Sequence, residues 1–186
     1  MTRPSAPLAL LLALAALAGA CGNDTGAVEL AWVFVDRDGD AIYPGGVFTA
    51  EDERDSCDLP GVLGDEGVTY DLRVELEICD PGCAAGCDAD ECLVVPRHEF
   101  PCITARGNDP EVPASDEPYR FTVRALLDAA ELGGECRDPA PCLAVPAPRE
   151  RVVTAGRVTD LQVYQIVVDV DRQGDASLEL EECGCA

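Results

Sequence analysis

Apolar and polar residues alternate along two stretches of the chain, residues 68–78 and 119–127, apart from Leu126 near the end of the second. A period of two places every second side chain on one face, so each stretch predicts a β-strand with one buried and one solvated face. Residues 28–35 predict an earlier strand, and residues 161–170, apolar on both faces, predict a late strand at the centre of a sheet. Shorter strands are expected at 93–95, 143–145, 151–154 and 177–180.

No run of helical period follows the apolar N-terminus, and one short helical turn is expected around residues 126–132. Many short strands, 14 Pro and 17 Gly favour an all-β fold, an antiparallel β-sandwich. In architecture alone this arrangement resembles the Ig-like and transthyretin-like sandwich modules of bacterial surface proteins, without the Cys and Trp spacing of antibody domains. We expect one such domain over residues 27–186.

The chain opens on an apolar run, residues 8–18, that follows one basic residue, Arg3, and ends in Gly19 and Ala20. The run is much shorter than the roughly 20 residues that a membrane-spanning helix needs. This pattern predicts a signal peptide over residues 1–20 and an exported protein.

The residues Leu17, Ala18, Gly19, Ala20 and Cys21 resemble the lipobox of bacterial lipoproteins, although Ala18 stands where that family prefers Leu. The resemblance is confined to this N-terminal segment. It implies that Cys21 carries a lipid, with residues 21–26 as a tether. It also implies an outer-membrane address in a Gram-negative bacterium, because Gly22 replaces the Asp associated with inner-membrane retention. Ordinary secretory cleavage beside Cys21 is the alternative.

The chain has 11 cysteines, and exported chains pair their thiols because their compartment is oxidising. If Cys21 holds a lipid, an even set is left that can close completely. The disulfide candidates are Cys57, Cys79, Cys83, Cys87, Cys92, Cys102, Cys136, Cys142, Cys183 and Cys185.

Residues 79–102 hold five of these cysteines and predict a disulfide-stapled insertion in the sandwich. A zinc or iron–sulfur site is the rival interpretation, but such sites favour Cys-x-x-Cys pairs or His ligands, and His98 is the only histidine. The similar segments CDADECLVVP and CRDPAPCLAVP suggest local bridges from Cys87 to Cys92 and from Cys136 to Cys142. A longer bridge from Cys57 to Cys102 would pin the insertion to the sheet.

The net charge is −23, and removal of residues 1–20 takes away Arg3 and no acid, which moves it to −24. Such a surface repels nucleic acid and anionic membrane surfaces, whose binding requires clustered basic residues. It favours solubility, a protein partner or a cationic partner. The sequence indicates no cofactor.

Asp36, Asp38 and Asp40 alternate like the first ligands of a calcium loop. The pattern then fails, because Ala41 stands where such loops have Gly and Val47 where they have Glu. Asp-Gly also marks a hairpin turn, so these residues are only a weak calcium candidate.

Catalysis finds little support in the sequence. A Ser–His–acid triad would depend on His98 and on Ser56, Ser115 or Ser177, and no nucleophile-elbow motif is present. We therefore expect a binding or structural module of the cell envelope, held at the membrane by its lipid, rather than an enzyme. A calcium-dependent adhesion protein and a secreted hydrolase are the alternatives.

Overall fold

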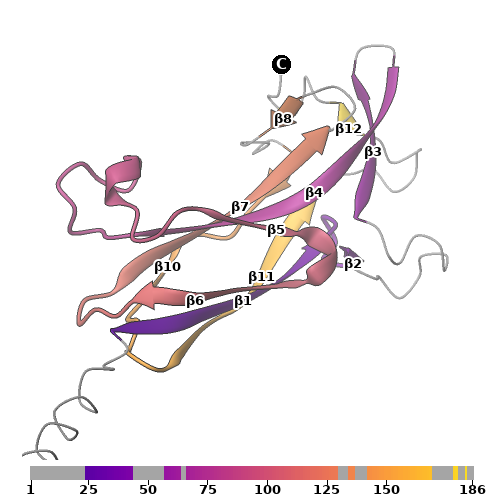
Figure 1. Cartoon of the computed structure of the whole chain (residues 1–186). Coiled ribbons are helices and arrows are strands. Elements are labelled where there is room, and N and C mark those ends of the chain that lie inside the picture. Colours follow the sequence, from indigo (N-terminus) through magenta and orange to yellow (C-terminus); the bar gives the residue numbers. More distant parts are fainter. Residues whose placement is uncertain are drawn as a thin grey trace, which may run out of the picture.

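The described part of the chain folds into two facing β-sheets (Figure 1). In this computed structural model the described residues are 24–43, 57–63, 66–129, 134–136, 142–168, 178–179 and 183. The predicted all-β sandwich is confirmed. The segment that resembles a lipoprotein signal peptide, Cys21 included, lies outside the described residues.

The first sheet has five strands, with β1 at its centre. They are β1 (Thr25–Val35), β2 (Ala41–Tyr43), β6 (Arg106–Pro113), β9 (Leu143–Ala144) and β11 (Val158–Val168). β1 pairs with β11 in parallel, and on its other edge it pairs with β6 and then β2 in antiparallel fashion. β1 thereby joins the first part of the chain to the last long strand.

The second sheet has seven strands, with β4 at its centre. They are β3 (Asp58–Leu63), β4 (Glu66–Cys79), β5 (His98–Pro101), β7 (Tyr119–Ala129), β8 (Gly134–Cys136), β10 (Arg149–Arg151) and β12 (Leu178–Glu179). β7 pairs with one edge of β4, while β3 and β5 lie end to end along the other. Two 3₁₀ turns, η2 (Asp90–Cys92) and η3 (Cys102–Thr104), flank β5.

The alternation that predicted β4 and β7 corresponds to burial between the sheets. On β4 the inward side chains are at most 1% exposed: Tyr70, Leu72, Val74, Leu76 and Ile78. They pack in one core with Phe121 and Leu127 of β7 and with Trp32, Phe34 and Ile166 of the first sheet. Each large apolar side chain buried in this way contributes about 1.5–3 kcal/mol.

The predicted central position of the late strand is wrong over most of its length. β9 pairs only with Val167 and Val168 at the end of β11, and Val163 on the outer face is 54% exposed. A β-bulge explains the misleading pattern, because Gln162 has a positive φ of 63° and shifts the alternation of inward side chains.

The shorter expected elements also differ in detail. Leu93 makes a single bridge to Cys79 instead of beginning a strand. The residues expected to open a helical turn continue β7 to Ala129, because Leu126 and Leu127 are buried on opposite faces of that strand. The strand expected at 151–154 is wrong beyond its first residue, because β10 ends at Arg151. β9 and β12 fall within the strands expected at 143–145 and 177–180.

Candidate functional site

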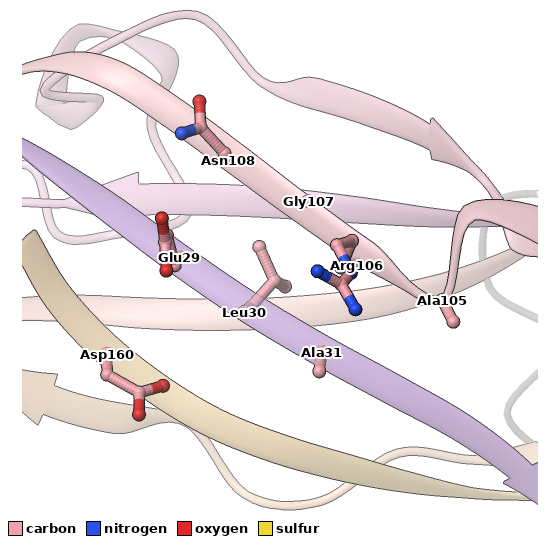
Figure 2. A pocket seen from close by; sticks show the side chains of 8 residues that line it. All are labelled: Glu29, Leu30, Ala31, Ala105, Arg106, Gly107, Asn108 and Asp160. Atoms are coloured by element: carbon pink, nitrogen blue, oxygen red, sulfur yellow. The ribbon is translucent and has the colours of Figure 1, made fainter.

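A groove of about 330 Å³ opens on the outer face of the first sheet, where β1 lies between β6 and β11. It is lined by Glu29, Leu30, Ala31, Ala105, Arg106, Gly107, Asn108 and Asp160. Figure 2 shows the Glu29 and Asp160 carboxylates on neighbouring strands and the Arg106 guanidinium farther along the groove. The strand register agrees, because Glu29 pairs with both Asn108 and Asp160, whereas Ala31 pairs with Arg106.

The small side chain of Ala31, on the outer face between Arg106 and the next strand, leaves the hollow of the groove. Within the described part of the chain, no ion pair joins Arg106 to Glu29 or Asp160. The groove thus presents separate acceptors and donors to a ligand. The bulge fixes the Asp160 carboxylate, because the backbone amide of Gln162 donates to Asp160 Oδ1 at 2.7 Å.

The cysteine-rich segment between β4 and β5 forms a lobe that projects from one end of the sandwich (Figure 1). Its disulfides, Cys79–Cys87 and Cys83–Cys92, interleave along the sequence. Between Asp80 and Cys92 the backbone makes a hydrogen bond every three residues, which coils the segment into successive turns. The predicted bridge from Cys87 to Cys92 is wrong, because this series of turns brings each cysteine beside a more distant one.

An ionic network attaches the cysteine-rich lobe to the outer face of the second sheet. Arg97 donates to Glu77 on β4 at 2.9 Å and to Asp90 in the lobe at 2.8 Å. Arg124 on β7 reaches the same Glu77 oxygen at 3.3 Å, and Glu77 itself is only 2% exposed. The hydrogen bonds that Arg97 donates to Glu77 and Asp90 raise the pKa of Arg97, so its charge persists and orients the lobe.

Two further disulfides fix the sandwich. Cys57–Cys102 joins the segment before β3 to the turn after β5, the point at which these two strands meet beside β4. This prediction is confirmed. Cys142 pairs with Cys183, so the predicted bridge from Cys136 to Cys142 is wrong. The side chain of Cys136 and all of Cys185 lie outside the described residues.

The Asp36–Asp40 stretch forms the turn between β1 and β2. Asp36 is 3% exposed, and its Oδ1 accepts the amides of Asp38 and Asp40 at 3.0 and 2.8 Å. Gly39 supplies the positive φ of 87° that such a turn requires. The side chains of Asp38 and Asp40 are exposed, and Asp36 uses an oxygen to hold the backbone. Val47 lies outside the described residues.

His98 faces an acid that the sequence did not single out. Its Nδ1 lies 3.2 Å from Oδ2 of Asp109 on β6, and the Asp109 side chain is 5% exposed. The two residues join the two sheets at one edge of the sandwich. Ser115 accepts the amide of Glu117 in a turn, and Ser56 and Ser177 lie outside the described residues. In the described ranges no hydroxyl joins the His98–Asp109 pair.

Among the residues that the structure describes, no group of three or more His, Cys, Asp or Glu side chains has a geometry suited to a metal ion. In the same ranges no helix is long and apolar enough to cross a membrane. No protein-family model matches the chain, and neither the curated proteins nor the solved structures contain a significantly similar chain.

Proposed function

We propose that the chain is an exported cell-envelope protein, anchored through a lipid on Cys21, that acts as a binding or structural module. The observation that carries this proposal is the set of four disulfides in the described residues. Such a set is typical of proteins from oxidising compartments outside the cytoplasm. Lipid attachment and an outer-membrane address rest on the resemblance of the N-terminal segment to a lipobox.

The groove of Figure 2 is the part of the surface that suits ligand binding best. Carboxylates at one position and a guanidinium at another match a polar ligand that carries both charges, such as a peptide segment. Val158 and Val163, on the same sheet, are 57% and 54% exposed and add apolar contact area beside the groove.

A secreted hydrolase is the second candidate, and the His98–Asp109 pair is the observation in its favour. An acid that orients an imidazole is one part of a triad. We rank binding first because the described residues supply no nucleophile in contact with His98. An activity found by substrate screening and abolished in His98→Ala would reverse this order.

The intact mass of the protein purified from its native membrane fraction tests the proposal. We expect a chain that begins at Cys21 with a diacylglycerol and an acyl group, and ten alkylated thiols that appear only after reduction. A soluble chain without lipid and with an unpaired thiol would contradict the anchor. It would also direct attention to a covalent dimer or a reactive cysteine.

A further inference from the structure

The groove on the first sheet consists of two neighbouring rows of side chains that cross β6, β1 and β11. The strand register gives an acidic row, Asn108, Glu29 and Asp160, and beside it a mixed row, Arg106, Ala31 and Val163. Both rows lie on the outer face, because the residues that alternate with them, such as Leu30, Asp109 and Tyr164, are buried between the sheets. The side chains of both rows are therefore available to one ligand.

The acidic row holds two carboxylates on directly paired residues. Neighbouring strands lie about 4.8 Å apart, so Glu29 and Asp160 carry like charges at short range and repel each other. In the described part of the chain, no arginine or histidine side-chain nitrogen lies within 4 Å of either carboxylate. Glu77 and Asp128 on the second sheet, by contrast, are paired with arginines. A cation from outside the protein would relieve the repulsion in the acidic row.

Asp160 is oriented before any cation arrives. Its Oδ1 accepts the backbone amide of Gln162 at 2.7 Å, while Oδ2 makes no hydrogen bond to the described atoms. Figure 2 shows the Asp160 and Glu29 carboxylates on the same side of the sheet. Because one of the two carboxylates is already ordered, binding of a cation costs little additional conformational entropy.

An anion site lies one row away. Arg106 has no ion pair in the described ranges, and Figure 2 shows its side chain turned from β6 toward β1. A guanidinium presents parallel N–H donors that match the two oxygens of a carboxylate. Two residues span about 6.7 Å along a strand, so the anionic group of a ligand must lie about that far from its cationic group.

The surface next to both charged sites is apolar. Ala31 offers only a methyl group, and Val163, which pairs with it on β11, is 54% exposed. An aliphatic chain that joins the cation and the anion of a ligand would cover this surface and gain free energy from the burial. The groove therefore suits a ligand with two opposite charges and an apolar stem between them.

We infer that the groove binds a lysine with a free carboxylate, its ammonium between Glu29 and Asp160 and its carboxylate on Arg106. Six bonds of about 1.5 Å join the ammonium to the carboxylate carbon, and at about 1.25 Å of advance per bond they span about 7.5 Å. The source is the C-terminus of a peptide or the free amino acid. The α-ammonium of free lysine would lie close to Arg106, which favours the peptide. This inference rests on the proposed role as a binding module and names its ligand class.

Isothermal titration of the purified exported protein in neutral detergent and low salt tests this inference. 6-Aminohexanoate carries both charges at the spacing of lysine, whereas pentylamine carries only the cation. We expect 6-aminohexanoate to bind at least about fivefold more tightly than pentylamine. Glu29→Gln/Asp160→Asn should weaken binding of both probes at least about tenfold, since the cation loses both partners. Asp160→Asn keeps an oxygen for the Gln162 amide, so the bulge is preserved.

Arg106→Gln separates the two charged sites. It should remove the advantage of 6-aminohexanoate and leave the affinity for pentylamine unchanged, because pentylamine has no carboxylate. Arg120→Gln is the matched control, since Arg120 is an exposed arginine on the second sheet without an ion pair in the described ranges. It should change neither affinity.

Three lysine compounds distinguish the sources: N-acetyl-glycyl-lysine, its C-terminal amide and free lysine. Tightest binding of the acetylated peptide acid supports the inference and identifies a peptide C-terminus, whereas equal or tighter binding of free lysine supports it and identifies the amino acid. The inference is wrong if 6-aminohexanoate binds no better than pentylamine, if the amide binds as tightly as the acid, or if Arg120→Gln acts like Arg106→Gln. The mass measurement tests export and the lipid anchor separately, so either proposal can fail alone.

Discussion

His98 on β5 and Asp109 on β6 meet across the edge of the sandwich, with 3.2 Å between Nδ1 and Oδ2. Within the described ranges, the only other polar contact of the Asp109 carboxylate is the Glu111 amide at 3.2 Å. His98→Ala therefore leaves a carboxylate that is 5% exposed with one partner fewer. We expect the free energy of unfolding to fall by about 1 kcal/mol in urea denaturation.

The double variant His98→Ala/Asp109→Asn provides the control for this pair. A neutral amide is less costly to bury than a carboxylate, so the double variant should regain part of the lost stability. A denaturation midpoint of His98→Ala equal to that of the unchanged protein would show that the pair contributes nothing.

Gly107 on β6 lies against the ring of Phe100 on β5. A Cβ at this position would stand 2.7 Å from Phe100 Cε2, and the ring is held in turn by Trp32, with 5.8 Å between centroids. Gly107→Ala should lower the free energy of unfolding by about 1–3 kcal/mol through overpacking. Gly82→Ala is the control, since its Cβ would meet only Asp80 Oδ1 at 3.2 Å in an exposed turn. Equal effects of the two substitutions would contradict the packing argument.

The disulfides differ in the length of chain that they close. Cys57 and Cys102 are separated by 45 residues, and Cys79 and Cys87 by 8. Loop-closure entropy then predicts losses of about 4 kcal/mol for Cys57→Ala/Cys102→Ala and about 2.5 kcal/mol for Cys79→Ala/Cys87→Ala. Thermal unfolding of the two double variants measures the order, and a larger loss for the shorter loop would contradict this account.

The sequence predicted the strands in which burial or exposure of each side chain is the main factor that selects the residue type. Alternation located β4 and most of β7, because burial between the sheets selects every second side chain. The same rule failed at β11, where Gln162 adopts a positive φ that its residue type does not reveal. Cys57–Cys102 followed from the position of the insertion, whereas the interleaved pairs depend on turns that spacing alone does not define.

The candidate groove could not be predicted from the sequence, for a related reason. Glu29 and Asp160 are neighbours only because β1 and β11, far apart in the chain, pair in parallel with a bulge. Each is one of 36 acids in the sequence, so no local signal distinguishes it. Asp109 likewise becomes a partner of His98 only because β5 and β6 meet at the edge of the sandwich.

Glu77 and Asp90 both bind Arg97, but their surroundings differ. The Glu77 side chain is 3% exposed and that of Asp90 is 81% exposed. Glu77→Ala removes the shared partner of Arg97 and Arg124 and should cost about 2–4 kcal/mol, because a charge pair shielded from water is broken. Asp90→Ala should cost less than about 0.5 kcal/mol, since exposed pairs are weak. Chemical denaturation compares them, and similar losses would rule out a special role for Glu77.

Tyr70 and Tyr164 place two hydroxyls in the core, and neither has a hydrogen-bond partner among the described atoms. Burial raises the pKa of both phenols, although the charges of Arg149 and Arg151 oppose the shift at Tyr164. Below pH of about 10 both states of the protein carry neutral phenols. Above it the unfolded chain loses protons that the folded protein keeps, so stability should fall as the pH rises.

Denaturant unfolding at a series of pH values between about 8 and 11, with tyrosinate absorbance as a second signal, measures this decline. Tyr70→Phe/Tyr164→Phe should reduce it, and at pH of about 8 the same variant should be more stable by about 1 kcal/mol because two unpartnered hydroxyls leave the core. Tyr119→Phe, at a partly exposed position, should keep the decline of the unchanged protein. An undiminished decline in the double variant would assign the alkaline loss of stability to other groups.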